Sequence, residues 1–304
     1  MQRSTLVNLG LRTRVHKANF GLAAGVAITG IAAYSFYSYS ASDTKTQTSS
    51  PPKVFGSGPV FKSLQLDSVE TLNHDTKRFR FALPTENSLS GLTYTSTVLT
   101  FSRPKERFFP VIRPYTPVSD LNEPGYLDLV IKEYPQGKAS RHIHSLKPGD
   151  SLTFLTAIKS YDWKANERSH VTLLAGGAGI TPLYQLLHGI LTNPLDRTKI
   201  TLVFGINTDA DALFREQFSK YEKQFPDRFK VLYTVTNPSA GSQFHKGRIT
   251  KELLKKVMAE DGERDTKFFV CGPPPMEEAL MGAKGKGGGI LGELGVEKER
   301  IHKF

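Results

Sequence analysis

From about residue 168 to the end of the chain, short apolar runs alternate with helical patterns, and few folds accommodate that alternation. The runs are predominantly apolar, as is typical of parallel strands covered on both faces. The pattern predicts a doubly wound parallel sheet over residues 168–304, with ligands at the carboxyl ends of its strands. The predicted strands are 170–175, 199–205, 229–235 and 267–272, and the predicted helices are 182–191, 212–225, 249–260 and one near Met276.

Residues 59–162 follow a different rhythm, in which short runs alternate between polar and apolar side chains. Turn signals such as Pro124-Gly125 and the stretch 147–150 separate these runs. Short strands at regular spacing indicate an antiparallel barrel or sandwich. The predicted strands are 77–83, 96–101, 126–132 and 151–155.

Composition excludes several classes of function. The single cysteine, Cys271, rules out an intramolecular disulfide, a dithiol redox pair and a self-contained cysteine-ligated iron–sulfur cluster. The net charge of +11 suits an acidic partner. The chain has no zinc pattern, no helix-turn-helix signature and no basic run interleaved with aromatic residues, so we do not expect a nucleic-acid partner.

The N-terminus predicts targeting and membrane attachment. Residues 1–19 contain arginine, lysine and hydroxyl side chains without a carboxylate, as mitochondrial targeting segments do. Residues 20–40 are uncharged and long enough to cross a bilayer, which needs about 20 residues. Residues 41–58 are rich in Ser, Thr, Pro and Gly and predict a linker. A secretory signal or an endoplasmic-reticulum anchor is the alternative interpretation of this leader.

A glycine-rich turn follows the first predicted strand of the second half, in the stretch AGGAGITP at 175–182. Gly177 and Gly179 allow a sharp turn and a close approach of backbone to ligand. We expect Thr181 to cap the following helix, whose free N–H groups can hold phosphate. An ordinary tight loop between strand and helix has the same pattern.

Two other strand ends contain polar or rigid groups. Asp211 or Asp209 follows the second strand, where a carboxylate can accept hydrogen bonds from an adenosine ribose and repel a 2′-phosphate. This favours NADH over NADPH, although the positive charge of Arg215 nearby in the sequence weakens the inference. The alternative interpretation is that these carboxylates only stabilise the N-terminus of a helix. Cys271 begins the stretch CGPPPM, whose prolines end the last strand in a stiff wall.

The first half contains two further candidate stretches. In RPYTP at 113–117, two prolines stiffen a segment with a cation, an aromatic ring and a hydroxyl, which suits a flat charged ligand or an ordinary edge strand. In QGKAS at 136–140, Gly137 precedes a helix start whose backbone donors could hold phosphate. His142 and His144 face different ways on that helix and lack a third ligand, so no metal site is predicted and a solvated helix face is favoured.

The four motifs RPYTP, GKxS, GGxGITP and CGPP, in this order over residues 55–304, resemble the NADH–cytochrome b5 reductase family of ferredoxin reductase-like flavoproteins. With the leader, the chain is most similar to the fungal mitochondrial form. The resemblance implies a transmembrane helix, then an antiparallel FAD-binding β-barrel over 59–162, then an NADH-binding doubly wound domain over 168–304. By resemblance, the FAD-binding residues are Arg113, Tyr115, Thr116, Val130, Lys132, Gly137, Lys138, Ala139, Ser140 and Thr181.

The same resemblance assigns the nucleotide side and the chemistry. It implies that NADH contacts Gly177, Gly179, Asp211, Cys271, Gly272, Pro273 and Met276. The catalytic residues it implies are Thr116, Lys132 and Cys271, with Cys271 shaping the hydride path without a covalent bond. Three stretches depart from the family pattern, which usually has Thr at Ala178, Gly-Gly-Lys-Met-Ser at 136–140 and Gly-Pro at Thr156-Ala157.

The activity implied by the resemblance is hydride transfer from NADH to FAD, followed by single-electron transfer to a cytochrome b5-type haem protein. The chain contains no haem motif or cluster ligands, so the acceptor is expected to be a separate protein. The implied location is the mitochondrial outer membrane or intermembrane space, with a single N-terminal anchor. A quinone or dye reductase and a scaffold that has lost its flavin are the two alternatives.

Overall fold

The computed structural model describes residues 50–56, 60–104, 109–261, 265–283 and 288–304. Residues Pro51–Phe304 form one compact unit. The predicted targeting segment 1–19, the predicted membrane helix 20–40 and most of the predicted linker 41–58 lie outside the described residues. Within the described ranges, no helix combines the length and apolarity needed to span a bilayer.

The first domain is a six-stranded antiparallel sheet, as its alternating pattern predicts. On β3, the buried residues Val98 and Thr100 alternate with more exposed neighbours. The strand order is β4-β3-β6-β1-β2-β5, and no ladder joins the edge strands β4 and β5 among the described residues. The strands are β1 (Lys62–Thr71), β2 (Thr76–Ala82), β3 (Ser96–Ser102), β4 (Val111–Tyr115), β5 (Tyr126–Lys132) and β6 (Ser151–Lys159).

Two details of this sheet differ from the prediction. Strand β1 was not predicted, because its buried side chains are only Leu64 and Leu66 in a mainly polar stretch. Strand β6 continues past residue 155 through Thr156-Ala157, which pair with Leu99 and Val98 of β3. The departure from the family pattern at these positions therefore lies inside a regular strand.

Helix α2 (Lys138–His144) follows β5, at the position predicted for a helix start. The prediction of a solvated face for its histidines is wrong for His144. Its side chain is 4% exposed, and Nε2 lies 2.8 Å from the carbonyl oxygen of Ile131. The ring also packs against Phe79, so His144 fastens α2 to the sheet.

The second domain is the predicted parallel sheet, in the order β10-β9-β8-β7-β11-β12. From β7 the chain continues through β8, β9 and β10 on one side of that strand. It then returns to β11 and β12 on the other side of β7. This reversal opens a crevice at the carboxyl ends of β7 and β11, where open α/β sheets bind ligands. The strands are β7 (His170–Gly176), β8 (Lys199–Ile206), β9 (Phe229–Val235), β10 (His245–Lys246), β11 (Thr266–Cys271) and β12 (Ile301–Lys303).

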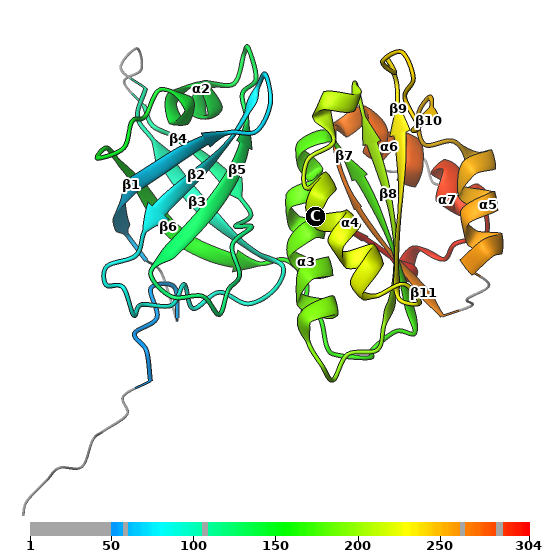
Figure 1. Cartoon of the computed structure of the whole chain (residues 1–304), viewed down its shortest axis with the longest axis horizontal. Helices are drawn as coiled ribbons and strands as arrows, with labels where there is room; N and C mark the ends of the chain where they lie inside the picture. Colours follow the sequence, from blue (N-terminus) through cyan, green and yellow to red (C-terminus); the bar gives the residue numbers. More distant parts are fainter. Residues whose placement is uncertain (1–49, 57–59, 105–108, 262–264, 284–287) are drawn as a thin grey trace, which may run out of the picture. The chain divides into compact units, whose positions relative to one another are not determined.

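Helices cover both faces of this sheet (Figure 1), which confirms the doubly wound arrangement. On one face, α3 (Ile180–Thr192) and α4 (Arg215–Gln224) pack against Leu173 of β7. On the other face, α5 (Lys251–Asp261), α6 (Pro274–Met281) and α7 (Gly289–Glu293) pack against Leu174. Short 3-10 turns complete the domain at η1 (Gly177–Gly179), η2 (Asp209–Asp211) and η3 (Lys298–Arg300).

Side chains of the second domain bond to the backbone of the first. Gln185 on α3 is 2% exposed, and its Nε2 donates to the carbonyl oxygens of Ser96 at 3.3 Å and Pro117 at 3.0 Å. Asn73 in the first domain donates to the carbonyl oxygen of Ala210 at 3.1 Å. The two Gln185 bonds are buried and therefore costly to break, so they hold the first domain against α3, whereas the Asn73 bond is exposed.

Candidate functional site

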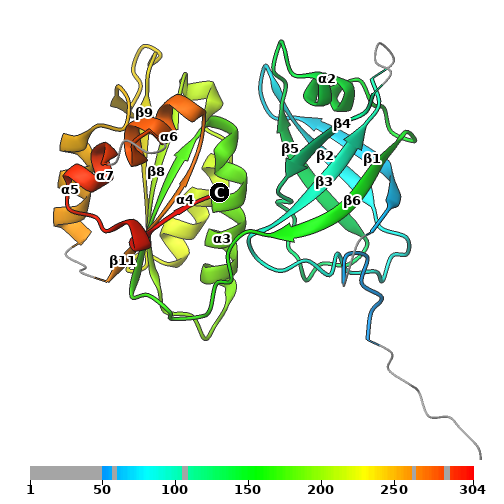
Figure 2. The same cartoon turned by 180° about the vertical axis from the view of Figure 1, so that it is seen from behind.

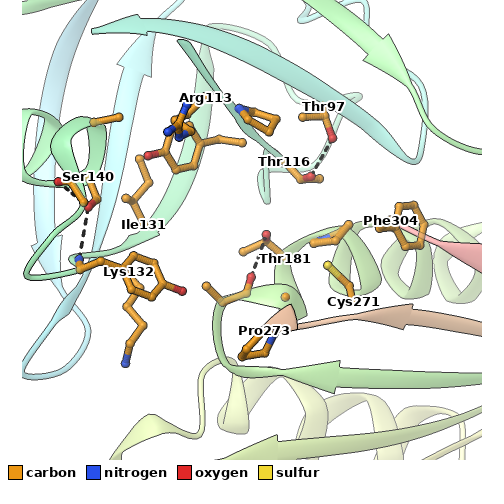
Figure 3. Close-up of a pocket in the computed structure, with 18 of the residues that line it drawn as sticks. Thr97, Arg113, Thr116, Ile131, Lys132, Ser140, Thr181, Cys271, Pro273 and Phe304 are labelled. Carbon is orange, nitrogen blue, oxygen red and sulfur yellow. Dashed lines mark hydrogen bonds between the residues drawn. The ribbon is translucent and has the colours of Figure 1, made fainter. Parts of the chain in front are cut away.

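A cavity of about 810 Å³ lies where the two domains meet, and motif residues from both domains line it. Figure 3 shows Arg113, Thr97 and Thr116 on one side of it, with Thr181, Cys271 and Phe304 on the other. A cavity of this size is within the range of small-molecule and cofactor sites. The residues that the sequence placed in four separate motifs thus come together.

Strand β4 presents the first motif to the cavity. Arg113 is exposed, and its Nη1 donates to the carbonyl oxygen of Ile112 at 2.8 Å. Burial raises the pKa of Tyr115 to about 12, so the phenol stays neutral at physiological pH. The Thr116 hydroxyl lies 3.0 Å from the Thr97 hydroxyl, which fixes its direction. The stretch therefore offers an exposed cation beside a neutral phenol and a hydroxyl whose direction is fixed.

The loop after β5 forms the next wall with Val130, Lys132, Gly137, Lys138, Ala139 and Ser140, all of which line the cavity. Ser140 Oγ accepts from the Tyr134 N–H at 3.2 Å and donates to the Gly137 carbonyl at 3.1 Å. A Cβ on Gly137 would lie 2.3 Å from that Oγ, so the tight loop requires glycine. Hydrogen bonds within the loop therefore fix its shape. Lys138 is exposed and lies at the rim of the cavity.

The glycine turn of the second domain approaches β11 very closely. A Cβ on Gly179 would lie 2.3 Å from the carbonyl oxygen of Cys271. The turn therefore brings the start of α3 against the end of β11 with backbone alone between them. The capping role predicted for Thr181 is wrong, because α3 has Gly179 at its N-cap and Thr181 Oγ1 donates to the Ala178 carbonyl at 3.2 Å. Backbone N–H groups at the start of a helix such as α3 can bind a phosphate.

Cys271 lies at the end of β11 beside the C-terminal Phe304, and both line the cavity. Burial, and next the charge of Glu277, raise the pKa of the Cys271 thiol to about 12. The protonated thiol is a small apolar group and a poor nucleophile at neutral pH. This agrees with a role that shapes the cavity without covalent chemistry.

We expect Cys271 to react with iodoacetamide about a thousandfold more slowly at pH 8 than a free thiol of pKa about 9, because the thiolate fraction falls by that factor. The labelling rate should keep rising with pH toward 12. The same burial makes the folded state lose stability as the pH rises above 9, the ordinary thiol pKa. Mass spectrometry of the labelled protein measures the rate, with the guanidinium-unfolded chain as control. Labelling of the folded protein as fast as that of the unfolded chain would contradict this assignment.

A second cavity, of about 350 Å³, continues from the glycine turn along the ends of β8 and β9. Asp211 lies in its wall and is 8% exposed. Its Oδ2 accepts from the N–H of Thr208 at 3.0 Å and from its hydroxyl at 2.9 Å, while the buried Oδ1 has no hydrogen-bond partner. Oδ1 has one charged neighbour, the Lys132 ammonium at 3.6 Å, and its second lone pair can accept a hydrogen bond from a ligand.

Asp209 and Arg215, the two residues that left the ribose contact open in the sequence, lie outside the second cavity. The carboxylate of Asp209 accepts from the Ser239 N–H at 2.7 Å and the Ser242 hydroxyl at 2.5 Å. The Arg215 guanidinium lies 5.0 Å from the centre of the Phe244 ring. Neither residue lines the second cavity, whereas Arg248 does.

Lys132 connects the two cavities, because it lines both. Its ammonium forms an ion pair with Asp75 and lies 3.6 Å from Asp211 Oδ1. Burial opposes the charged form, but the hydrogen bond and charge of Asp75 outweigh it and raise the pKa of Lys132. His74, Asp75 and Asp211 could hold a metal ion by their spacing, but the Lys132 ammonium already supplies a cation there.

The residues present fit an extended dinucleotide in each cavity. The first offers the cations Arg113 and Lys138 beside a glycine-dependent loop. The second offers the backbone of the glycine turn and the Asp211 carboxylate, whose Oδ1 accepts no hydrogen bond within the protein. Sequence reasoning missed five residues: Thr97, Tyr134, Gln185, Arg248 and Phe304. Their positions depend on strand register and on the meeting of distant segments, so no local motif marks them.

Two family models match the chain, one described as an oxidoreductase FAD-binding domain over residues 63–163 and one as an oxidoreductase NAD-binding domain over 173–281. "NADH-cytochrome b5 reductase 2" of Pyricularia oryzae is 43% identical, over 93% of this chain and 88% of the relative. The protein of the same name in Emericella nidulans is 44% identical, over 93% and 89%. The crystal structure of the cytochrome b5 reductase domain of Ulva prolifera nitrate reductase is 29% identical, with a TM-score of 0.69, and the match covers 80% of this chain and 97% of that one.

Proposed function

The chain belongs to the NADH–cytochrome b5 reductase family, and we propose that its two cavities hold FAD and NADH end to end across the meeting edge of the domains. The enzyme transfers a hydride from NADH to FAD and then electrons to cytochrome b5. The observation that carries the residue assignment is the first cavity, where the β4 motif of one domain faces Cys271 of the other. The bound cofactors supply the hydride and electron chemistry, and the protein supplies alignment and shielding.

On the flavin side, Arg113 and Lys138 provide positive charge for a diphosphate. Thr116 is a positioned hydroxyl, because its hydrogen bond to Thr97 sets the direction in which its remaining donor or lone pair points. Tyr115 contributes a neutral ring surface. We assign FAD binding also to Val130, Gly137, Ala139, Ser140 and Thr181, which line the same cavity.

On the nucleotide side, the turn at Gly177 and Gly179 offers backbone N–H groups, and Asp211 offers Oδ1 to a ribose hydroxyl. Gly272, Pro273 and Met276 complete the wall between the two cavities. Cys271 keeps its proton and excludes water where the two cavities meet. Lys132 ties Asp211 to the first domain and so couples nucleotide position to the flavin site.

The test is an anaerobic titration of the full-length protein, purified without added cofactor. We expect a yellow protein whose flavin absorbance bleaches within one equivalent of NADH and returns when oxidised cytochrome b5 is added. A colourless protein would overturn the assignment of FAD to the first cavity. If the flavin absorbance returns with a quinone but not with cytochrome b5, the assignment of the cofactor sites holds and the acceptor is a quinone instead.

We propose further that residues 20–40 anchor the enzyme in a mitochondrial membrane and that residues 1–19 direct it there. The uncharged run and the acid-free basic start support this proposal. Alkaline carbonate extraction of isolated mitochondria tests it, with protease added to intact and osmotically swollen organelles. Recovery in the microsomal fraction, or full release by carbonate, would overturn it.

A further inference from the structure

The C-terminal residues reach the first cavity from one edge of the second domain's sheet. Strand β12 has three residues and pairs in parallel with β11, and no strand of the described ranges pairs with its other side. Figure 2 shows this C-terminal segment in red beside β11. The N–H of Phe304 donates to the carbonyl oxygen of Val270 at 3.1 Å, and Phe304 lines the cavity. A chain end on so short a strand stays in place only if other contacts tie it down.

A buried carboxylate supplies such a contact. Glu277 lies in the first turn of α6 and is 7% exposed. Its Oε2 lies 2.6 Å from the Lys303 ammonium at the end of β12. Its Oε1 accepts a hydrogen bond from the Gly272 N–H at 3.3 Å. The two oxygens of one carboxylate therefore join the C-terminal strand to the turn after β11, where Gly272 lines the cavity.

A simpler role for Glu277 is to complement the dipole of α6, as acids in a first helical turn often do. That role requires neither burial nor a partner outside the helix. Glu278, the next residue, is exposed, whereas Glu277 is buried. Burial of a carboxylate is costly unless paired charges and hydrogen bonds offset it. Lys303 and Gly272 provide that offset, and neither belongs to α6.

We propose that Glu277 is a positioning residue for hydride transfer and acts through Gly272 on one side and Lys303 on the other. It holds the turn after β11 at a fixed place relative to the C-terminal Phe304, so the cavity keeps its shape between them. The inference rests on the proposed function, which assigns the nucleotide to Cys271 and Gly272, and it adds the residues that hold this wall. Glu277 and Lys303 line neither cavity, so both act through other residues.

The kinetic test compares the full-length enzyme with Glu277→Gln, Lys303→Met and the double variant. Each single variant should reduce its flavin with NADH about tenfold more slowly, since a shift of about 1 Å near reacting groups costs about a hundredfold and a smaller shift costs less. The double variant should be no slower than either single variant, because all three lack the same ion pair. Anaerobic stopped-flow absorbance measures these rates.

The KM for NADH separates positioning from binding. It should stay within about threefold of the parent value in all three variants, because the glycine turn and Asp211 are unchanged and the loss falls on kcat. Glutamine at position 277 also keeps an oxygen for the Gly272 N–H. Steady-state kinetics with ferricyanide measure the KM. Circular dichroism and FAD content establish that each variant is folded and loaded.

Two control variants match the charges removed. Glu278→Gln removes the neighbouring, exposed carboxylate of the same helix. Lys251→Met breaks an ion pair of the same kind in the same domain, in which the Lys251 ammonium lies 2.8 Å from Glu293 Oε2. Neither residue lines a cavity. Both controls should reduce their flavin within about twofold of the parent rate, as loss of surface charges usually has little effect.

Cys271 provides a second readout that needs no bound cofactor. Burial is the main cause of the raised pKa of its thiol, the charge of Glu277 raises it further, and Lys303 lowers it. Iodoacetamide should therefore label Cys271 about fivefold faster in Glu277→Gln and about fivefold slower in Lys303→Met at pH 8, since the thiolate fraction changes tenfold per pKa unit. General loosening of the fold would instead expose the thiol and speed labelling in both variants.

The outcomes separate this inference from the proposed function. A parent enzyme whose flavin NADH does not reduce would overturn the proposed function, and the positioning role with it. A normal parent with both single variants at its rate would overturn the positioning role alone. Faster labelling in both variants would also overturn it, because loss of packing would then explain slow flavin reduction. Slow single variants, no further loss in the double variant and opposite changes in labelling would support it.

Discussion

A Gly179→Ala variant should reduce its flavin with NADH roughly a hundredfold more slowly than the parent enzyme, because misplacement by about 1 Å near the reacting groups costs that much. The added Cβ would lie 2.3 Å from the Cys271 carbonyl oxygen and 2.7 Å from the Gly272 nitrogen. These are backbone atoms of β11 and its continuation, so no side-chain rotation relieves the contact. Either α3 or the end of β11 must shift, and both border the meeting point of the two cavities. Anaerobic stopped-flow absorbance measures the rate.

Two other glycines of the same turn provide a graded control. Gly177 has a φ of +50° with open space where its Cβ would be, so Gly177→Asn should remain within a few-fold of the parent. A Cβ on Gly176 would lie 2.4 Å from Met276 Sδ, which belongs to a flexible side chain. The rate of flavin reduction in Gly176→Ala should therefore lie between the rates of Gly179→Ala and the parent enzyme. Circular dichroism and FAD content establish that each variant is folded. A folded Gly179→Ala enzyme with the parent rate would show that this close approach does not set nucleotide position.

The longer strands and helices of the second domain could be predicted from sequence because their signals are local, whereas the short strands β10 and β12 were not predicted. Runs such as 199–205 are apolar and end in turn residues, and the strand found there, β8, covers the prediction. The first domain was predicted less completely. Strand β1 buries few side chains and is held by its pairing with β2 and β6, which is non-local information. The glycine-rich stretch 282–295 predicts a mobile loop, but its described part includes helix α7, whose Leu291 is buried in the core.

The motif residues were predicted as parts of a site because short fixed spacing around proline and glycine reports local backbone geometry. What the spacing could not give is the partner of each side chain. Thr116 is held by Thr97, nineteen positions away in the sequence. Lys132 is held by Asp75 and approaches Asp211 across the domain edge. Such pairs depend on strand register and domain contact, and only the folded chain reveals them.

The choice between Asp211 and Asp209, open in the sequence, becomes a sharp prediction about nucleotide preference. Asp211→Asn should lower the ratio of kcat/KM for NADH to that for NADPH by about a hundredfold. A carboxylate opposes a 2′-phosphate by about 4 kcal/mol per charge pair at 4 Å with an effective dielectric constant near 20, and solvent screening reduces this. Asparagine keeps an oxygen for the Thr208 N–H that Asp211 accepts, so the turn should persist. Steady-state kinetics with both nucleotides, using ferricyanide as acceptor, measures the ratio.

Asp209→Asn is the matched control, since it removes the same charge two residues away. Its carboxylate is already bonded to Ser239 and Ser242 outside the second cavity, so the nucleotide ratio should stay within about threefold. A large change in Asp209→Asn with none in Asp211→Asn would move the ribose contact to Asp209. Equal small changes in both would mean that neither carboxylate selects NADH. The exposed Arg248, which lines the same cavity, would then decide the preference through its own charge, and Arg248→Gln would be the variant that alters the ratio.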